Sequence, residues 1–218
     1  MKLPYIKSSL LILSVLFADQ FLKFWVKLHM TFGEELHVLG HWALIRLVEN
    51  NGMAFGMELG GDIGKLILSL FRIVAVCGIG YALHYLIKNK FHFGLVISVS
   101  LIFGGALGNI IDSAFYGLIF SETDYYTPGK LVPLFHGYAN LFHGKVVDML
   151  YFPLLHGVFP HWVPFWGGEE FIFFRPVFNL ADSAISIGVA LLLIFQKHYY
   201  DRGEFQDKSY LDSEIIEE

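Results

Sequence analysis

Residues 93–114 read FGLVISVSLIFGGALGNIIDSA, and no charged side chain occurs in this stretch before Asp112. A helix that crosses a bilayer needs roughly 20 mostly apolar residues, so the stretch is long enough to span a membrane. Gly104 and Gly108 form a small-xxx-small pattern, which is typical of a helix face that packs closely against another helix. The stretch therefore predicts a transmembrane helix with Asn109 and Asp112 near its end.

Three more segments have the same character, at about 8–28, 65–87 and 178–196. The chain of 218 residues is 55% hydrophobic and only 16% charged, whereas soluble domains carry about 25% charged residues. The first segment also resembles a secretory signal peptide. However, its apolar run continues past Asp19 for longer than a typical signal core, and no clear cleavage site follows, so we expect a retained helix. The sequence predicts an all-α polytopic membrane protein with four transmembrane helices.

The basic residues predict how the chain is oriented, because Lys and Arg concentrate on the cytoplasmic side of membrane proteins. Three clusters flank the spans and fall on one side of the membrane if there are four spans: Lys2 with Lys7, Lys88 with Lys90, and Lys197 with Arg202. Both termini are then cytoplasmic, and the long loops at 29–64 and 115–177 face outward. The strand-like run 42–48 predicts a small extracytoplasmic sheet or cap.

These patterns predict one membrane-embedded domain over residues 1–200 and an acidic, disordered tail over residues 201–218. The formal net charge of -5 owes much to this tail. The basic residues are scattered rather than gathered into a patch, which argues against nucleic-acid binding.

Polar residues gather at the predicted outward ends of the spans. They are Asp19 and Lys23 in the first span, Asn109 and Asp112 in the third, Asn179 and Asp182 at the start of the fourth, and Asp148 in the second outward loop. Ionisable groups within spans are costly and are functional candidates by default. Each also has a structural explanation: Asp19 and Lys23 have the i,i+4 spacing of an ion pair, and Asp182 suits a helix start. Their shared depth predicts one site.

Two aspartates close together in a poorly hydrated place cannot both ionise easily, so one keeps its proton. The ionised carboxylate can then take a proton from water, while the protonated one polarises a peptide carbonyl. We select Asp148 and Asp182 as this catalytic pair, because a loop and a helix start can form a cleft that admits an extended peptide. This chemistry needs no metal and no cofactor.

Other catalytic groups are poorly represented. Four histidines lie in the second outward loop without the tight spacing of a zinc motif: His136, His143, His156 and His161. Cys77 is the one cysteine and lies in an apolar run, which indicates a small hydrophobic side chain rather than a nucleophile. The sequence contains no G-x-S-x-G, P-loop or dinucleotide fingerprint.

Five short motifs, in order along the chain, resemble those of the lipoprotein signal peptidases (signal peptidase II). They are Asp19-Gln20-x-x-Lys23, Asn50-Asn51-Gly52-Met53-Ala54-Phe55-Gly56, Gly104-Gly105-Ala106-Leu107-Gly108-Asn109-Ile110-Ile111-Asp112, Val146-Val147-Asp148 and Phe178-Asn179-Leu180-Ala181-Asp182-Ser183. The second motif has Met53 where the family pattern has alanine. The motifs extend over all four spans, so the resemblance covers most of the chain.

The resemblance implies an aspartic endopeptidase of the bacterial cytoplasmic (inner) membrane, with its active site at the outer face. Its substrate would be a prolipoprotein whose cysteine carries a diacylglyceryl group, and it would cleave just before that cysteine. The same resemblance makes Asp148 and Asp182 the catalytic pair. It assigns Asn50, Asn109, Asp112 and Asn179 to the substrate pocket, and Asp19, Lys23, Gly108 and Ala181 to support of the fold.

The chain departs from the family pattern in two places. The third motif usually ends in Asp-Arg, but here Ser113 follows Asp112, and we suggest Arg175 as the replacement for the missing arginine. An insertion at 115–145, rich in aromatic residues and histidine, separates Asp112 from Asp148 where a short turn is expected. It is a lid, a partner surface or a decorated loop.

Two alternatives come from other classes of protein. A small proton-coupled transporter or channel subunit would also place acids within its spans, but such sites lie at the bilayer midplane, often between repeated halves. An inactive scaffold would lack the catalytic acids, and both are present. We expect a monomer whose partners are prolipoprotein signal peptides and membrane lipid.

Overall fold

The structure, a computed structural model, describes residues 2–51 and 61–216 and contains two compact units. Unit 1 comprises residues 1–20, 67–111 and 180–218, and unit 2 comprises residues 21–66 and 112–179. Most of the helical residues lie in unit 1, and the strands lie in unit 2.

Four helices in the described part of the chain are long and apolar enough to cross a membrane, which confirms the predicted spans. The long helices are α1 (Lys2–His29), α2 (Gly61–Lys88), α3 (Phe93–Ile111) and α5 (Leu180–Ile216). The third span is longer than the sequence indicates. A π-helical segment, η2 (Asp112–Tyr116), and the short α4 (Gly117–Ile119) follow α3, so the apolar span extends to Ile119 instead of ending near Ala114.

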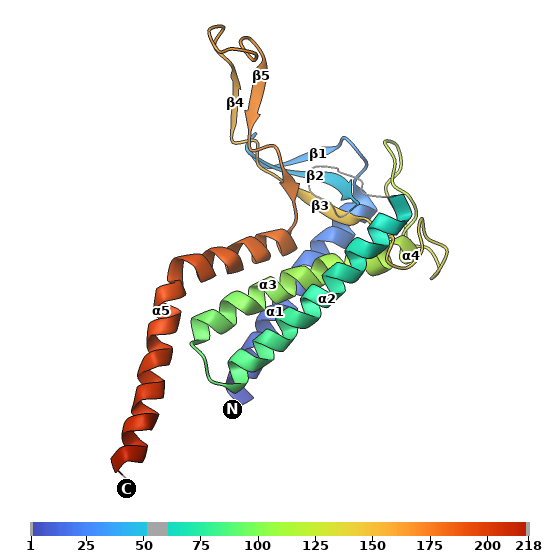
Figure 1. Cartoon of the computed structure of the whole chain (residues 1–218). Coiled ribbons are helices and arrows are strands. Elements are labelled where there is room, and N and C mark those ends of the chain that lie inside the picture. The colour runs from blue at the N-terminus through green and yellow to red at the C-terminus, as the bar shows by residue number, and fades with distance from the viewer. Residues whose placement is uncertain (1, 52–60, 217–218) are drawn as a thin grey trace. The chain divides into compact units, whose positions relative to one another are not determined.

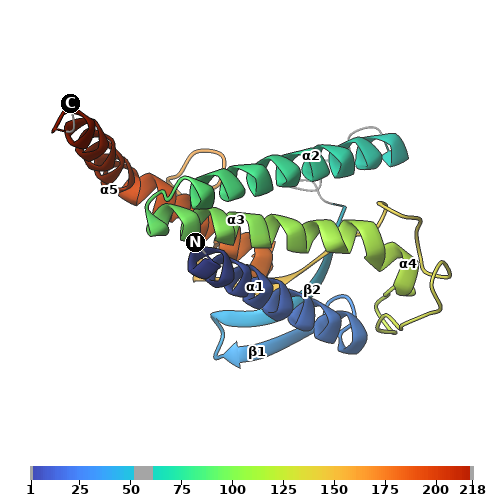
Figure 2. The ribbon, with the colours of Figure 1, turned by 90° about the horizontal axis from the view of Figure 1, so that it is seen from below.

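The helices of unit 1 pack through apolar side chains and glycines. Helices α1, α2 and α3 lie side by side (Figures 1 and 2) around Leu83, Ile87 and Val96, which are nearly inaccessible to solvent. Helix α3 also packs along α5. There a β-carbon added to Gly105 would overlap the carbonyl oxygen of Ala181. Gly105 therefore lets these two backbones approach closely. Gly104, which belongs to the predicted small-xxx-small pattern, lies instead against Ile12 and Val15 of α1.

Unit 2 is built on a four-stranded antiparallel sheet with the order β1-β2-β3-β6. Its strands are β1 (Glu35–Leu39), β2 (Ala43–Asn50), β3 (Val146–Tyr151) and β6 (Val177–Phe178). Strand β2 confirms the strand-like run in the first predicted loop, but two of the four strands come from the second loop. The sheet is therefore a joint product of both loops.

The core of unit 2 is apolar and lies against strands β2 and β3. It contains Leu47 of β2, Val147 and Met149 of β3, and Tyr116 and Phe120, which follow α3; all are at most 2% exposed. The aromatic rings of Tyr116 and Phe120 meet edge to face, with centroids 4.9 Å apart. A separate hairpin, β4 (Leu155–Val158) with β5 (Glu170–Phe173), extends from this unit (Figure 1).

The segment after residue 200 differs from the expected disordered tail, because its backbone continues α5 as far as Ile216. Glu and Asp are the most frequent residues of this segment, and of these two Glu has the higher helix propensity. An acidic composition therefore did not prevent a helical backbone here.

Candidate active site

Asp148 lies in the middle of the sheet of unit 2, on strand β3, where it pairs with Val48 of β2. The expectation that a loop carries this residue is wrong. The run Val146–Tyr151 is apolar and β-branched at its start, and it is buried along nearly its whole length, which is typical of an inner strand. Only 4% of Asp148 is exposed. A central strand holds its backbone more firmly than a loop would.

Two asparagine amides hold the carboxylate of Asp148. Asn50 Nδ2 donates to Oδ2 at 3.2 Å, and Asn179 Nδ2 donates to Oδ1 at 2.8 Å. Asn50 ends β2, whereas Asn179 lies between β6 and the start of α5 and is fully buried. The structure thus brings three sequence-predicted residues together, and each oxygen of the acid accepts a hydrogen bond from an amide.

Asp112 and Lys23 form a buried ion pair beside this group. Lys23 Nζ lies 2.7 Å from Asp112 Oδ2, and both side chains are 0% exposed. The same carboxylate oxygen accepts the backbone N–H of Val147 at 3.2 Å. Asp112 is therefore bonded to the residue that precedes Asp148, a positioning contact that the sequence did not indicate. The i,i+4 pairing of Asp19 with Lys23 stays a prediction.

In unit 1, Asp182 lies in the first turn of α5 and is half-buried. Asn109 Nδ2 of α3 donates to Asp182 Oδ1 at 2.8 Å. A carboxylate in the first turn also interacts favourably with the positive end of the helix dipole. The predicted neighbours Asn109 and Asp182 are therefore in direct contact.

Asp19 binds the start of α5 from α1. Its Oδ1 accepts the backbone N–H of Ala181 at 2.9 Å, and Asp19 itself is 0% exposed. The first N–H groups of a helix lack partners within the helix, so this bond satisfies a donor that burial would otherwise leave unpaired. A β-carbon added to Gly108 would lie 2.9 Å from Asp19 Oδ2 and 3.4 Å from the side chain of Ala181. Asp19, Gly108 and Ala181 therefore lie together, and their role in support of the fold stays a prediction.

A second charged cluster in unit 2 was missed. Lys27 Nζ forms an ion pair with Glu49. The side chain of Lys27 is only 1% exposed, so water does not compete for this pair. Lys145 Nζ binds the other oxygen of Glu49 at 3.0 Å, and Lys27 also donates to Thr123 Oγ1 at 2.7 Å. The available signal was the i,i+4 spacing of Lys23 and Lys27, which puts both lysines on one face of α1.

This cluster joins the insertion 115–145 to the sheet. The hydroxyl of Tyr138, in the insertion, accepts the backbone N–H of Lys145 at 2.7 Å, and burial raises the pKa of Tyr138 above its usual range. The pKa of Asp124, also in the insertion, is lowered by backbone N–H bonds from Tyr126 and Thr127. The insertion is therefore attached to the unit through specific polar contacts.

The remaining predicted site residues are not brought together with the others in the described part of the chain. Arg175 lies between β5 and β6 with an exposed side chain, and no ion pair joins it to any described residue. Residues 52–56 of the second motif lie outside the described residues. The two candidate acids lie in different units, Asp148 with Asn50 and Asn179 in unit 2, and Asp182 with Asn109 in unit 1.

Known proteins are similar to this chain in sequence. The family model for signal peptidase (SPase) II matches residues 11–197. A lipoprotein signal peptidase of Porphyromonas gingivalis is 55% identical over 188 residues, which are 84% of this chain and 80% of the relative. A lipoprotein signal peptidase of Amoebophilus asiaticus is 36% identical over 204 residues, 91% of this chain and 82% of the relative.

Solved structures agree in fold. A bacterial membrane enzyme whose structure was determined by the in meso method at 2.3 Å resolution matches with a TM-score of 0.56 and 25% identity, over 88% of each chain. A second such structure, at 1.9 Å, matches with a TM-score of 0.54 over 86% of this chain and 90% of that one. The family match covers most of the chain and the relatives share its length, so this multi-pass bacterial membrane protein belongs to the signal peptidase II family, the aspartic peptidases that remove signal peptides from lipoproteins.

Proposed function

We propose that Asp148 and Asp182 together activate one water molecule, and that the enzyme uses it to cut diacylglyceryl-modified prolipoproteins just before the lipidated cysteine. The observation that carries this proposal is the hydrogen bond from Asn179 to Asp148. Asn179 is three residues before Asp182, and three residues of extended chain reach at most about 10 Å. The side chain that holds one acid is thus linked to the other acid by a very short piece of chain.

The reaction needs the two carboxyl groups in different protonation states. One carboxylate takes a proton from water as the oxygen attacks the scissile carbonyl carbon. The other, protonated, donates to the carbonyl oxygen and stabilises the negative charge that develops there. When the tetrahedral intermediate collapses, a proton passes to the leaving amine, which is the nitrogen of the lipidated cysteine. Two carboxyl groups that act on one water favour a single shared proton, which gives the two states at once.

The asparagines suit this mechanism, because an amide carries no charge that titrates. Asn50 and Asn179 hold Asp148, and Asn109 holds Asp182, each through Nδ2. An amide donor fixes the orientation of a carboxylate but does not itself gain or lose a proton during the reaction. We propose that the same asparagines shape the substrate pocket.

The family and the charges of the chain support this substrate and a position of the acids at the outer face of the membrane. A lipid-modified cysteine is anchored in the bilayer, so the acids must lie near one membrane face. The lysines near the ends of the spans favour cytoplasmic termini, and in that orientation Asp148 and Asp182 lie at the outer face. We propose that the enzyme acts there as a monomer.

We also propose that Arg175 replaces the family arginine missing at position 113. Its exposed guanidinium, free of ion pairs with the described residues, is available to bind substrate carbonyls. Arg175→Ala should then raise KM for the prolipoprotein. Unchanged cleavage rate and affinity in this variant would remove the idea without affecting the two acids.

The test uses purified full-length protein in detergent and a diacylglyceryl-modified prolipoprotein. Asp148→Asn and Asp182→Asn keep the shape of each side chain but cannot carry the proton, so each should lower the cleavage rate by about 10²–10⁴-fold. Asp124→Asn is the matched control, because Asp124 is an exposed acid in the insertion. Cleavage by the Asp148 or Asp182 variant at the rate of the Asp124 variant would refute the proposed mechanism.

A further inference from the structure

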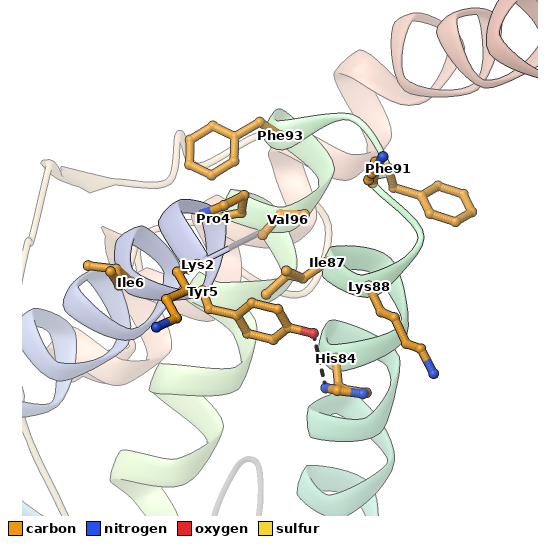
Figure 3. Close-up of a pocket in the computed structure, with 11 residues that line it drawn as sticks. Lys2, Pro4, Tyr5, Ile6, His84, Ile87, Lys88, Phe91, Phe93 and Val96 are labelled. Carbon is orange, nitrogen blue, oxygen red and sulfur yellow. Dashed lines mark hydrogen bonds between the residues drawn. The ribbon is translucent and has the colours of Figure 1, made fainter.

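A cavity of about 860 Å³ lies in unit 1, where the start of α1, the end of α2 and the start of α3 meet (Figure 3). Its walls are largely apolar and include Ile6, Ile87, Phe91 and Val96. The volume is within the range of about 300–1,000 Å³ that is typical of small-molecule sites. All three helices that form the cavity are long and apolar enough to span a membrane, so the cavity is within reach of lipid.

The polar lining of the cavity is basic. Lys2 of α1, Lys88 of α2 and Lys90 of the following turn line it, and none of its lining residues, all within the described chain, is acidic. No ion pair joins any of these three ammonium groups to a described residue. The ring of Tyr5 crosses from α1 towards α2, where its hydroxyl is 3.3 Å from His84 Nδ1 (Figure 3). Apolar walls are thus combined with three positive charges.

The helix dipoles explain only part of this charge. Lys88 lies in the last turn of α2, where a cation is favourable. Lys2 starts α1, where the helix dipole is itself positive, and α3 starts at Phe93, which also lines the cavity. Two positive helix ends and the lysines around the cavity make a positive rim, although Lys2 and Lys88 point away from one another (Figure 3).

Lys90 occupies a backbone position that favours glycine. Its φ is 57°, and the bonds from Lys90 N to Ile87 O (3.2 Å) and from Phe91 N to Leu86 O (3.0 Å) end α2 as a Schellman motif. Glycine adopts this left-handed conformation without the steric cost that a lysine meets. The backbone at this position therefore favours glycine, and the fold alone does not explain why a lysine is present.

We propose that this cavity binds an anionic phospholipid, with the phosphate at the end of the cavity that carries Lys88 and Lys90 and an acyl chain along the apolar walls. Basic pockets between membrane helices are suited to such head groups. A lipid, unlike free phosphate, uses both the charges and the apolar walls. The site is separate from the acids, because Lys2 and Asp19 are 17 residues apart in α1, which is roughly 25 Å of helix.

The experiment measures lipid binding to delipidated full-length protein by native mass spectrometry, with phosphatidylglycerol and phosphatidylcholine as probes. Phosphatidylglycerol should bind more tightly. The Lys88→Gln/Lys90→Gln variant should lose about tenfold or more of that affinity, since each lysine near a lipid head group contributes on the order of a fivefold factor. A matched Lys130→Gln/Lys197→Gln variant, which removes two exposed lysines elsewhere, should bind phosphatidylglycerol like the wild type.

Lys90→Gly serves as a second variant that does not endanger the fold. It relieves the left-handed lysine, so thermal stability without lipid should rise or stay the same, while affinity for phosphatidylglycerol falls. Equal binding of both lipids, or wild-type affinity in the Lys90→Gly and Lys88→Gln/Lys90→Gln variants, would overturn the proposal. Displacement of phosphatidylglycerol by millimolar inorganic phosphate would also overturn it, because the site would then be specific for phosphate rather than lipid.

Discussion

The two acids of the proposed catalytic pair are held by different kinds of structure. Asp148 lies on an inner strand, is 4% exposed and is bonded to the amides of Asn50 and Asn179. Asp182 lies in the first turn of a membrane helix and is only half-buried. Strand pairing and burial fix the first acid, whereas a helix end and Asn109 orient the second. The difference suggests that changes around Asp148 have larger effects than equivalent changes around Asp182.

The largest effect is expected from Lys23→Met, which acts on the unit that holds Asp148. The substitution leaves the carboxylate of Asp112 buried without its cation, and breaking a buried ion pair costs about 3–5 kcal/mol. We expect the free energy of unfolding in detergent to fall by that amount.

Arg46→Met is the matched control for Lys23→Met. Arg46 pairs with Glu35 across the surface of the same sheet, at 3.5 Å and with both side chains about a third or more exposed. Exposed pairs contribute about 0–1 kcal/mol, so this variant should unfold almost like the wild type. Similar losses in the two variants would show that burial of the Lys23–Asp112 pair does not matter.

Asn179→Ala is expected to have the next largest effect. It removes the donor 2.8 Å from Asp148 Oδ1 at a position that is 0% exposed, so water cannot readily replace it. A hydrogen bond to a charged group contributes about 1.5–3 kcal/mol, so kcat should fall by about 10- to 150-fold. Steady-state cleavage of the modified prolipoprotein, with circular dichroism as a check on folding, measures this loss.

Asn109→Ala removes the corresponding donor from Asp182 and should lower kcat less. Asp182 and Asn109 are both half-buried, so water can take the place of the amide. We expect a loss of about tenfold or less. A loss larger than that of Asn179→Ala, in the same cleavage assay, would reverse the comparison between the two acids.

The smallest effect concerns the insertion 115–145, which carries neither acid. Hydrogen bonds from the Tyr126 and Thr127 N–H groups depress the pKa of Asp124 below 3.8, so its ionised form stabilises the folded turn. This stabilisation is complete when the pH is above the pKa that Asp124 has in the unfolded chain. It is lost as the pH falls through the lower pKa that Asp124 has in the folded turn. The protection factor of the turn amides, which is their hydrogen exchange relative to the intrinsic rate at each pH, should therefore fall slightly more between pH 5 and pH 3 in the wild type than in Asp124→Asn. An equal change with pH in the wild type and in Asp124→Asn would contradict the proposed role of the Asp124 carboxylate.

Much of this fold was predictable because the membrane imposes a simple rule. Apolar runs of about 20 residues must be helices, and all four spans follow from that rule. The end of the third span was missed, because a π-helical segment carries the chain past the polar Asp112 to Ile119. The strand at 42–48 was also predictable, since its β-branched and aromatic residues are bounded by turn residues.

The polar contacts of the site were harder to predict from the sequence. The sequence predicts that Asn50, Asn179 and Asp148 belong to one site, but it does not show that both amides bind one carboxylate. Nor does it show that Lys23 pairs with Asp112, or that Lys27, Glu49 and Lys145 form a second cluster. These partners are far apart in the chain, and a spacing rule such as i,i+4 identifies only neighbours on the same helix.

The sequence by itself determined the membrane helices and the family, and it predicted the two acids of the proposed pair, because hydrophobic length and short motifs are local properties of the chain. Only the tertiary structure decided that Asp148 lies on an inner strand, and which side chains hold each acid. The physical reason is that a buried carboxylate requires partners, and these come from whichever elements the fold brings into contact with it.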